Sequence, residues 1–327
     1  MKKNLLILLI LSLCLHADET SPMRPQAPES PFRLRIGMLS EKPIQQMSYP
    51  GAFNSLLKHI VRHSTTRLDT DPLILRNFES DEIFTVPFIY ANYADRSDWK
   101  FSEKEVKNLR RYLTNGGVLY IDAGINSEFL RDSKAGGQRH SFADWEVSPD
   151  INDAFKQLFP NKKFRSLARS HQIFKTFYQG LPDPELLPEK VRQYVVQEKW
   201  PNGTYSLLGL EIDKRLSVIC SPIIAMGWAK NDQDRWVSNI SFRILESAPS
   251  LDSFLSNAAN RGNFKSRRED GLQDKIFLDV NKRPAWCVEP DGTTRAFNYY
   301  PGDAISDYAH RFYTRLGTNI LIYSLTF

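Results

Sequence analysis

The pattern of apolar and polar residues is clearest in the central part of the chain. Two apolar runs of strand length, residues 83–90 and 116–124, flank residues 103–113, where apolar side chains recur at helical spacing. A helical connection of this length makes the two strands parallel. Because both strands are continuous apolar runs, we expect them to lie inside a sheet that helices cover.

The helix in this unit carries its own start and stop signals. Ser102 supplies a hydroxyl that can cap free backbone amides, and Glu103 and Glu105 suit the positive end of a helix. Gly116 and Gly117 tolerate a positive φ and can close the last turn. The sequence therefore predicts a strand-helix-strand unit.

Similar patterns continue on both sides of this unit. They predict a first strand over residues 33–39, a helix after Gly51, a strand over 73–75, a helix over 149–159, strands over 191–197, 205–212 and 215–220, and a final helix over 303–325. Residues 229–300 have no clear period, and we expect an irregular insertion or small subdomain before the final helix.

The first residues have the composition of a secretory signal. Lys2 and Lys3 precede an apolar stretch over residues 5–11, which is too short to span a membrane, and cleavage is expected after Ala17. A lipoprotein signal at Cys14 fits less well, because a small residue is needed before that cysteine. We therefore expect an exported protein, periplasmic or extracellular, with no integral membrane span after cleavage.

This interpretation divides the chain into three parts. Residues 1–17 are the signal peptide, residues 18–32 are a proline-rich tether, and residues 33–327 are the folded domain. The tether would hold the domain away from its point of export.

The charge of the chain argues against a nucleic-acid partner. The 327 residues include 43 basic and 38 acidic ones, and cleavage of the signal removes Lys2 and Lys3. The remaining excess of positive charge is too small for a nucleic-acid-binding surface. Lys265, Arg267 and Arg268 are followed by two acidic residues, and we interpret them as a solvated loop.

Cleavage would also remove one of the three cysteines, leaving Cys220 and Cys287. An oxidising compartment permits a disulfide between them, which would add about 2 to 4 kcal/mol. Two separately buried thiols are the alternative, and the sequence leaves both open.

Several segments in order along the chain resemble the bacterial domain of unknown function 4159 family. They are Val86–Tyr90, Phe101–Glu105 with Leu109 and Arg110, Gly116–Asp122, Leu158–Pro160, His171–Phe174, and Arg315–Ile320 with Tyr323. The resemblance spans about residues 33–327 and implies a flavodoxin-like three-layer sandwich with a mainly parallel sheet, similar to class I glutamine amidotransferases. It implies no particular activity or cofactor.

The chain departs from those amidotransferases at the position of their nucleophile. They carry a cysteine on a sharp turn after a central strand, whereas the comparable strand here ends in Ile121-Asp122-Ala123-Gly124. Cys220 also follows an apolar strand, but Pro222 comes two residues later and no glycine elbow surrounds it. Glutamine hydrolysis is therefore not expected.

Polar residues follow the two central strands, where ligands of parallel sheets bind. Tyr90 and Asn92 belong to the end of one strand, and Asp122 and Asn126 to the end of the next. Asp122 could orient a substrate, bind a metal or act as a base. Alternatively, it accepts hydrogen bonds from the turn amides of residues 123–125.

His171 would complete an acid-base or metal pair if it lay beside Asp122. Alternatively, it anchors a loop through hydrogen bonds. His140 with Asp144 and Glu146 is a weaker group, because the spaced ligand pairs of a zinc site are absent, and no metal site is predicted.

Arg315 and Asn319 are four residues apart on the predicted final helix and therefore share one face. They are candidates for contacting a ligand. Alternatively, they form a polar network that ties the helix to the sheet.

The sequence thus supports two hypotheses of different classes. The first is an exported domain that binds an envelope protein or glycan without amidotransferase activity, through the strand ends around Tyr90, Asn92, Asp122 and His171. The second is a hydrolase of an envelope glycan or peptide that uses Asp122 and His171. Whether the protein is an enzyme is left open at this point.

Overall fold

The fold is described from a computed structural model. It describes residues 33–126, 146–197, 206–231, 233–248, 251–256, 260–267 and 271–327. Residues 34–327 form one compact unit. The signal peptide and the tether lie outside the described residues.

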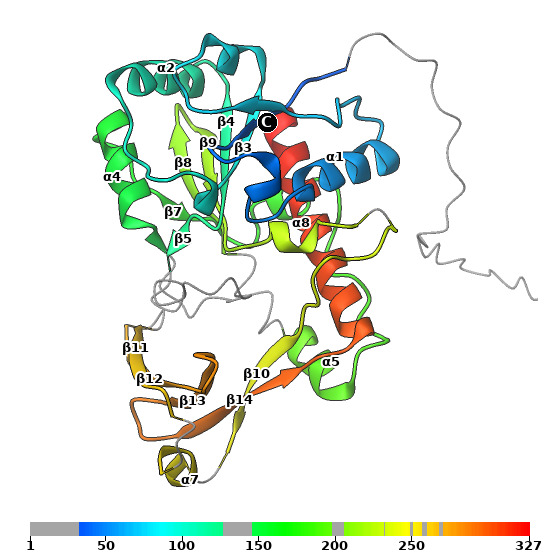
Figure 1. Cartoon of the computed structure of the whole chain (residues 1–327), viewed down its shortest axis with the longest axis vertical. Coiled ribbons are helices and arrows are strands. Elements are labelled where there is room, and N and C mark those ends of the chain that lie inside the picture. Colours follow the sequence, from blue (N-terminus) through cyan, green and yellow to red (C-terminus); the bar gives the residue numbers. More distant parts are fainter. Residues whose placement is uncertain are drawn as a thin grey trace, which may run out of the picture. The chain divides into compact units, whose positions relative to one another are not determined.

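A mixed sheet forms the centre of this unit (Figure 1). Within the described residues it has seven strands in the order β2-β1-β3-β4-β9-β8-β7. Strands β1, β2, β3, β4 and β9 are parallel, whereas β8 and β7 continue the sheet in antiparallel pairs. The strands are β1 (Gly37–Leu39), β2 (Leu73–Leu75), β3 (Phe88–Asn92), β4 (Val118–Asp122), β7 (Arg165–Ser166), β8 (Leu208–Ile212) and β9 (Arg215–Cys220).

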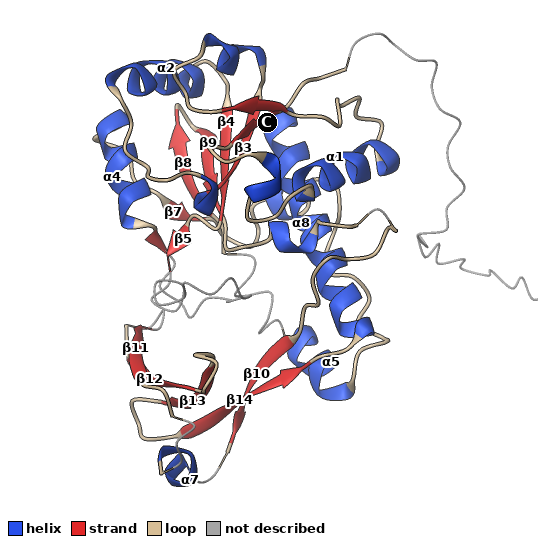
Figure 2. Cartoon of the chain, viewed as in Figure 1, coloured by secondary structure: helices blue, strands red, loops and turns tan. Residues whose placement is uncertain are grey.

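Helices cover this sheet, as Figure 2 shows. The α-helices are α1 (Ala52–His63), α2 (Glu103–Thr114), α4 (Pro149–Leu158), α5 (Glu189–Val196), α7 (Leu251–Leu255) and α8 (Asp303–Thr326). Short 3-10 helices are η1 (Ile44–Gln46), η2 (Asp81–Thr85), η3 (Tyr93–Asp95), η4 (Gln172–Phe174) and η5 (Ala225–Gly227). Among the described residues, none of the helices combines the length and the apolar character needed to cross a membrane.

The two faces of the sheet contribute to two separate hydrophobic clusters. Phe88 and Tyr90 of β3 pack with α1 and α8, whereas Ile89 and Ala91 of the same strand pack with α2 and α4. This alternation is the period of two expected when a strand is buried on both faces. The prediction that helices cover the central strands is therefore confirmed.

The local signals around α2 are also confirmed. The Ser102 hydroxyl accepts from the Glu105 backbone amide at 3.2 Å, and the Glu105 carboxylate accepts from the Ser102 amide at 3.0 Å, which forms a capping box. At the other end Gly116 has a φ of 109°, a conformation that favours glycine. The helix thus begins and ends where its own residues predict.

A second, antiparallel sheet occupies much of the segment predicted to be irregular. Its strand order is β10-β14-β13-β12-β11. The strands are β10 (Phe242–Ser247), β11 (Asn263–Arg267), β12 (Gln273–Leu278), β13 (Pro284–Val288) and β14 (Thr294–Tyr300). Of the two alternatives for residues 229–300, the irregular insertion is wrong over these strands. The sequence pattern missed them because they lack a clean alternation of buried and exposed side chains.

Three further predictions are corrected. Residues 83–85 belong to η2 rather than to the strand that follows, and Pro87 separates them from it. Residues 191–196 form part of α5, because Val191, Tyr194 and Val195 are spaced for one helical face. Lys265 and Arg267 lie on β11, an edge strand, rather than in a loop, and Arg268 lies outside the described residues.

Cys220 and Cys287 are both free and buried. Cys220 belongs to the cluster beside α2 and α4, and Cys287 packs with Ile276 and Phe297 in the second sheet. Of the two alternatives that the sequence left open, the structure contains separately buried thiols.

Candidate functional site

The carboxyl ends of β3 and β4 lie side by side, with Asn92 directly opposite Asp122. Both residues end apolar strands, and both are buried, with 2% and 0% of their surface exposed. The structure therefore brings together two of the candidates that the sequence placed at strand ends.

Hydrogen bonds occupy both oxygens of the Asp122 carboxylate. Oδ1 accepts from the backbone amide of Ile224 at 2.8 Å and from the Ser221 hydroxyl at 3.1 Å. Oδ2 accepts from the Asn92 side-chain amide at 2.9 Å and from the Ala225 backbone amide at 3.3 Å. Asp122 thus holds the chain after β9 to the end of β4. Its backbone donors are the amides of residues 224 and 225, and not the amides of residues 123–125 that the sequence suggested.

Burial raises the pKa of Asp122 to about 6, while the amides of Ile224 and Ala225, followed by the Ser221 and Tyr120 hydroxyls, pull it back down. The Tyr120 hydroxyl lies 2.8 Å from the Ser221 hydroxyl and 3.3 Å from Asp122 Oδ1. Each of these neighbours of the carboxylate can donate, so the ionised form fits the site at neutral pH. A base whose oxygens are all engaged has no lone pair directed at a substrate.

Tyr90 belongs to the core rather than to an open cleft. Its ring stacks on Phe53 with centroids 4.4 Å apart, and it also lies near Tyr120 and Trp228. Burial, and then the charge of Asp122, raises the pKa of Tyr90 well above its usual value. Its phenol therefore stays protonated at physiological pH.

His171 lies near the opposite end of the sheet. Its ring is 5.3 Å from that of Tyr323 on α8, and its Nδ1 accepts from the Ile173 amide at 3.2 Å, which caps η4. Burial lowers the pKa of His171, and Glu211 at the end of β8 opposes that shift. The histidine is therefore a loop anchor in this arrangement.

His171 and Asp122 lie near opposite ends of β4. Glu211, whose charge acts on His171, pairs with Leu216 next to Arg215 at the start of β9. Arg215 donates to the carbonyls of Gly116 and Gly117 before β4. Asp122 is the last residue of that five-residue strand. Four residue steps of about 3.3 Å place the two ends about 13 Å apart. The structure does not bring Asp122 and His171 together as a pair.

Arg315 and Asn319 connect α8 to the segment after η4. Asn319 Oδ1 accepts from the amides of Phe177 and Tyr178 at 3.1 and 2.7 Å, and Nδ2 donates to the Tyr178 carbonyl at 2.9 Å. The Arg315 guanidinium lies 5.2 Å from the Tyr178 ring. They therefore form a polar network, but it ties the helix to a loop rather than to the sheet.

The remaining candidates are only partly described. The backbone of Asn126 forms β5 (Ile125–Asn126), which pairs with β6 (Glu146–Val147). His140 and Asp144 lie outside the described residues, and Glu146 is exposed. Within the described ranges, the structure contains no group of three or more side chains that could hold a metal ion.

Two residues near the strand ends were missed by the sequence reasoning. Asp95 follows β3 and is 1% exposed, and Tyr49 follows β1 and is partly buried. Burial, and then the charges of Asp122 and Asp95, raises the pKa of Tyr49 to about 12. The sequence signal that could have identified Asp95 was its position three residues beyond β3, because loops at the carboxyl ends of parallel strands carry ligand contacts.

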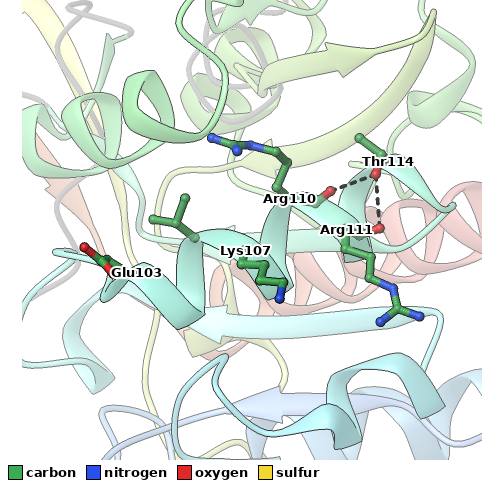
Figure 3. A pocket seen from close by; sticks show the side chains of 6 residues that line it. Glu103, Lys107, Arg110, Arg111 and Thr114 are labelled. Atoms are coloured by element: carbon green, nitrogen blue, oxygen red, sulfur yellow. Dashed lines mark hydrogen bonds between the residues drawn. The ribbon is translucent and has the colours of Figure 1, made fainter.

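A surface hollow of about 420 Å³ lies along the outer face of α2, away from these residues. Arg110 and Arg111 line it, and their side chains point in opposite directions (Figure 3). Arg110 donates to the carbonyls of Leu158 and Gln157 at the end of α4, and the Arg111 guanidinium lies 4.6 Å from the Phe84 ring. These cations join neighbouring elements and do not converge on one ligand position.

Cys220 does not have the surroundings of a nucleophile. The thiol is fully buried, and burial raises its pKa above the usual value. Since the thiolate is the reactive form, this cysteine is inert at neutral pH.

The fold and the site define an α/β protein with a mostly parallel sheet, a second antiparallel sheet and a buried carboxylate at the end of a central strand. The family model described as domain of unknown function (DUF4159) matches residues 35–248, and the chain belongs to this family. A comparison with curated proteins finds no significant match. The similarity of the Arg315–Tyr323 segment to the family lies outside the matched range and stays a prediction.

Proposed function

We propose that this chain is an exported protein of the bacterial cell envelope that binds a ligand or partner without catalysing a reaction on it. The observation that carries this proposal is the saturation of Asp122. Its two oxygens accept from Asn92, Ser221, Ile224 and Ala225, and none of its surface is exposed. A carboxylate held in this way stabilises the strand ends and is not available as a general base.

The positions of the other reactive groups support a non-catalytic role. His171 caps η4 near the far end of the sheet, so it is not available to act with Asp122. The buried Cys220 has a raised pKa, which opposes an amidotransferase mechanism.

We further propose that the main sheet is a flavodoxin-like three-layer sandwich, similar to that of class I glutamine amidotransferases. The order β2-β1-β3-β4-β9 of the parallel strands supports this, because it is the order of the doubly wound flavodoxin-like sheet. The two hydrophobic clusters on the faces of the sheet also support it. Ligands of such sheets bind beyond the carboxyl ends of the strands, and we place the binding face there.

The export part of the proposal rests on the N-terminal sequence. Lys2 and Lys3, the apolar stretch over residues 5–11 and Ala17 have the order of a secretory signal. Secretion of the domain would place it where envelope glycans and proteins are its available partners.

The test uses the mature chain, residues 18–327, with soluble fragments of bacterial envelope glycan and envelope peptides as probes. Thermal-shift titrations detect binding, and mass spectrometry of the same mixtures detects products. Binding without product formation is the expected result. Product formation that is lost in Asp122→Asn, in a variant shown to be folded, would overturn the proposal.

A further inference from the structure

The loops that follow β1 and β3 meet where the strand order of the main sheet reverses. From β1 the chain continues to β2 on one side, and then to β3 on the other side of β1. Helix α1 after β1 packs in one hydrophobic cluster, and α2 after β3 packs in the other. In open α/β sheets, such a reversal creates a crevice beyond the carboxyl ends of the two strands, where ligands bind.

Asp95 in the second of these loops has one occupied and one unoccupied oxygen. Oδ1 accepts from the amide and the hydroxyl of Ser48 at 2.8 and 2.9 Å, and Lys42 Nζ lies 3.6 Å away. Within the described part of the chain, Oδ2 has no hydrogen-bond partner, although the side chain is 1% exposed. A buried carboxylate oxygen without a donor is costly, and the cost is removed when a donor reaches it.

The hydroxyl of Tyr49, in the first loop, is a second polar group available for hydrogen bonding, in addition to Asp95 Oδ2. Among the residues that the structure describes, its hydroxyl has no hydrogen-bond partner. The charges of Asp122 and Asp95 both raise the pKa of Tyr49, so the phenol lies within electrostatic reach of both carboxylates. Asp95 Oδ2 needs a donor, and the Tyr49 hydroxyl can donate or accept.

Charges of both signs lie around these two groups. Lys42 lies beside Asp95, and Arg96 forms ion pairs with Glu41 and Glu105 at 3.6 and 3.0 Å. An added cation would meet Lys42 and Arg96, and an added anion would meet Asp95 and Asp122. The surroundings therefore favour a neutral ligand that carries hydroxyl groups, since a hydroxyl can both donate and accept.

The segment that contacts Asp95 is anchored at both ends and has few contacts between them. At one end Arg76 donates to the carbonyls of Ser40, Glu41 and Lys42 at 3.2, 3.2 and 2.9 Å, and at the other end Ser48 donates to Asp95. The segment contains η1, none of whose residues is buried, and Ile44 is 45% exposed. Lys42 Nζ holds this segment to the Ala94 carbonyl at 2.5 Å, at an exposed position. Met47 is the buried residue of the segment. Because η1 has no buried residue, it can move away while residues 40–42 and Ser48 stay anchored, and this movement opens a path to Asp95 Oδ2.

We propose that the crevice between the ends of β1 and β3 binds a neutral sugar or polyol, whose hydroxyl groups donate to Asp95 Oδ2 and bond with the Tyr49 hydroxyl. This inference rests on the proposed binding function and identifies its ligand class. It also moves the site from Asp122, whose oxygens are filled, to Asp95.

The test is saturation-transfer NMR on the full mature chain with maltose, cellobiose and N,N′-diacetylchitobiose. Inorganic phosphate and spermidine are the charged comparators. The variants are Asp95→Asn, which replaces the acceptor with a donor, and Tyr49→Phe, which removes one hydroxyl. His171→Asn, near the other end of the sheet, is the matched control, because asparagine also caps helical turns.

We expect at least one disaccharide to bind the wild type and the His171→Asn variant, and its affinity to fall at least about tenfold in Asp95→Asn and in Tyr49→Phe. We also expect the thermal midpoint of Asp95→Asn to match or exceed that of the wild type. Absence of disaccharide binding, equal binding by all variants, or competition by phosphate or spermidine would overturn the inference. So would a large fall in the Asp95→Asn midpoint, which would make Asp95 purely structural.

The two proposals fail separately. If envelope fragments bind the chain but neither Asp95→Asn nor Tyr49→Phe changes that binding, the binding function stands and this site is wrong. If envelope fragments are turned over, the binding function itself is wrong.

Discussion

Asp122 and Asp95 illustrate how two similar side chains acquire different roles. Both follow or end a parallel strand and both are buried. The oxygens of Asp122 are shared between backbone amides and side-chain donors, whereas the donors to Asp95 from the described residues lie at Oδ1. At the scale of the residue, the distribution of donors separates the architectural role of Asp122 from the ligand-binding role that we propose for Asp95.

Asp122→Asn is expected to lower the free energy of unfolding by about 1 to 3 kcal/mol at pH 7, measured by urea denaturation. The new side chain keeps one acceptor for Ile224. Its amide group then faces two other donors, the side chain of Asn92 and the amide of Ala225. Unchanged or higher stability would contradict the architectural role.

The exchange Asn92→Asp in the Asp122→Asn background is the control. It restores an acceptor opposite the new amide, so the double variant should be more stable than the sum of the two single changes predicts. Asn92→Asp alone places two carboxylates side by side and should be destabilising. Additive effects would mean that the contact between positions 92 and 122 contributes nothing.

Because the pKa of Asp122 is raised, the effect of Asp122→Asn on the free energy of unfolding depends on pH. Because the folded pKa is about 6 and the ordinary value is 3.8, folding favours the protonated carboxyl. The part of Asp122's contribution to stability that comes from this pKa difference is therefore fully present below pH 4 and is lost as the pH rises through 6, while its hydrogen bonds remain at pH 7. The difference between wild type and Asp122→Asn should widen between pH 7 and pH 4.5.

His59 is expected to weaken the fold in acid. Burial, and then the positive charges of His63, Lys230, Arg62 and Arg315, lowers its pKa from 6.5 to about 3. The unfolded chain takes up a proton first, so stability falls as the pH decreases through 6.5 toward 3.

The measurement compares unfolding free energies of wild type and His59→Gln at pH 7 and pH 5. The wild type should lose about 1 to 2 kcal/mol relative to the variant over this interval. Glutamine can keep the hydrogen bond to the Tyr178 hydroxyl, which His59 Nε2 makes at 2.9 Å. An unchanged difference would show that His59 does not control the acid response.

At the scale of the element, close packing of α8 depends on a residue that is a poor helix former. A Cβ atom at Gly317 would lie 2.7 Å from Cζ2 of Trp228. Trp228 is 2% exposed and donates to the Tyr313 carbonyl at 2.9 Å, so its ring is held in place. The glycine therefore allows the helix to approach this ring within a continuous helical segment.

Gly317→Ala is expected to lower the free energy of unfolding by about 1 to 3 kcal/mol, although alanine favours a helix by about 1 kcal/mol over glycine. The sign of the change in unfolding free energy thus shows whether the overlap with Trp228 or the higher helix propensity of alanine dominates. In a Trp228→Phe background the smaller ring reduces the overlap, and the cost of Gly317→Ala should fall. Stabilisation by Gly317→Ala in the wild-type background would contradict the packing argument.

At the scale of the whole molecule, the two sheets have unequal cores. The main sheet lies between two large clusters, whereas the described core of the second sheet consists of Ile276, Cys287 and Phe297 with a few partly buried neighbours. Phe242 and Ile244 of β10 belong to a cluster of the main sheet. The second sheet thus shares its first strand with the core of the main unit.

The proposed export predicts a defined mature chain. Expression of the full sequence in a bacterium with a secretory pathway should give a periplasmic or secreted protein that begins at Asp18, as measured by intact mass. Substituting Ala17 with a bulky residue should block or shift the cleavage. A cytoplasmic product that keeps Lys2 and Lys3 would contradict the signal-peptide assignment.

The sequence by itself determined the elements whose signals are local. Ser102 and Glu105 are close enough along the chain to cap α2 without help from elsewhere, and continuous apolar runs define β4 and β9. The apolar residues that recur at helical spacing along the whole of α8 are likewise a property of its own segment.

Tertiary structure decided which polar residues meet. The amides that hold Asp122 lie about a hundred positions away along the chain, at 224 and 225, and His171 lies near the end of the sheet opposite to it. Within the described part of the chain, the lack of a hydrogen-bond partner at Asp95 Oδ2 likewise depends on where the segment of Ser48 packs. Local patterns specify backbone conformation through short-range sterics and hydrogen bonds, whereas the partners of a buried polar group come from strand order and packing between distant segments.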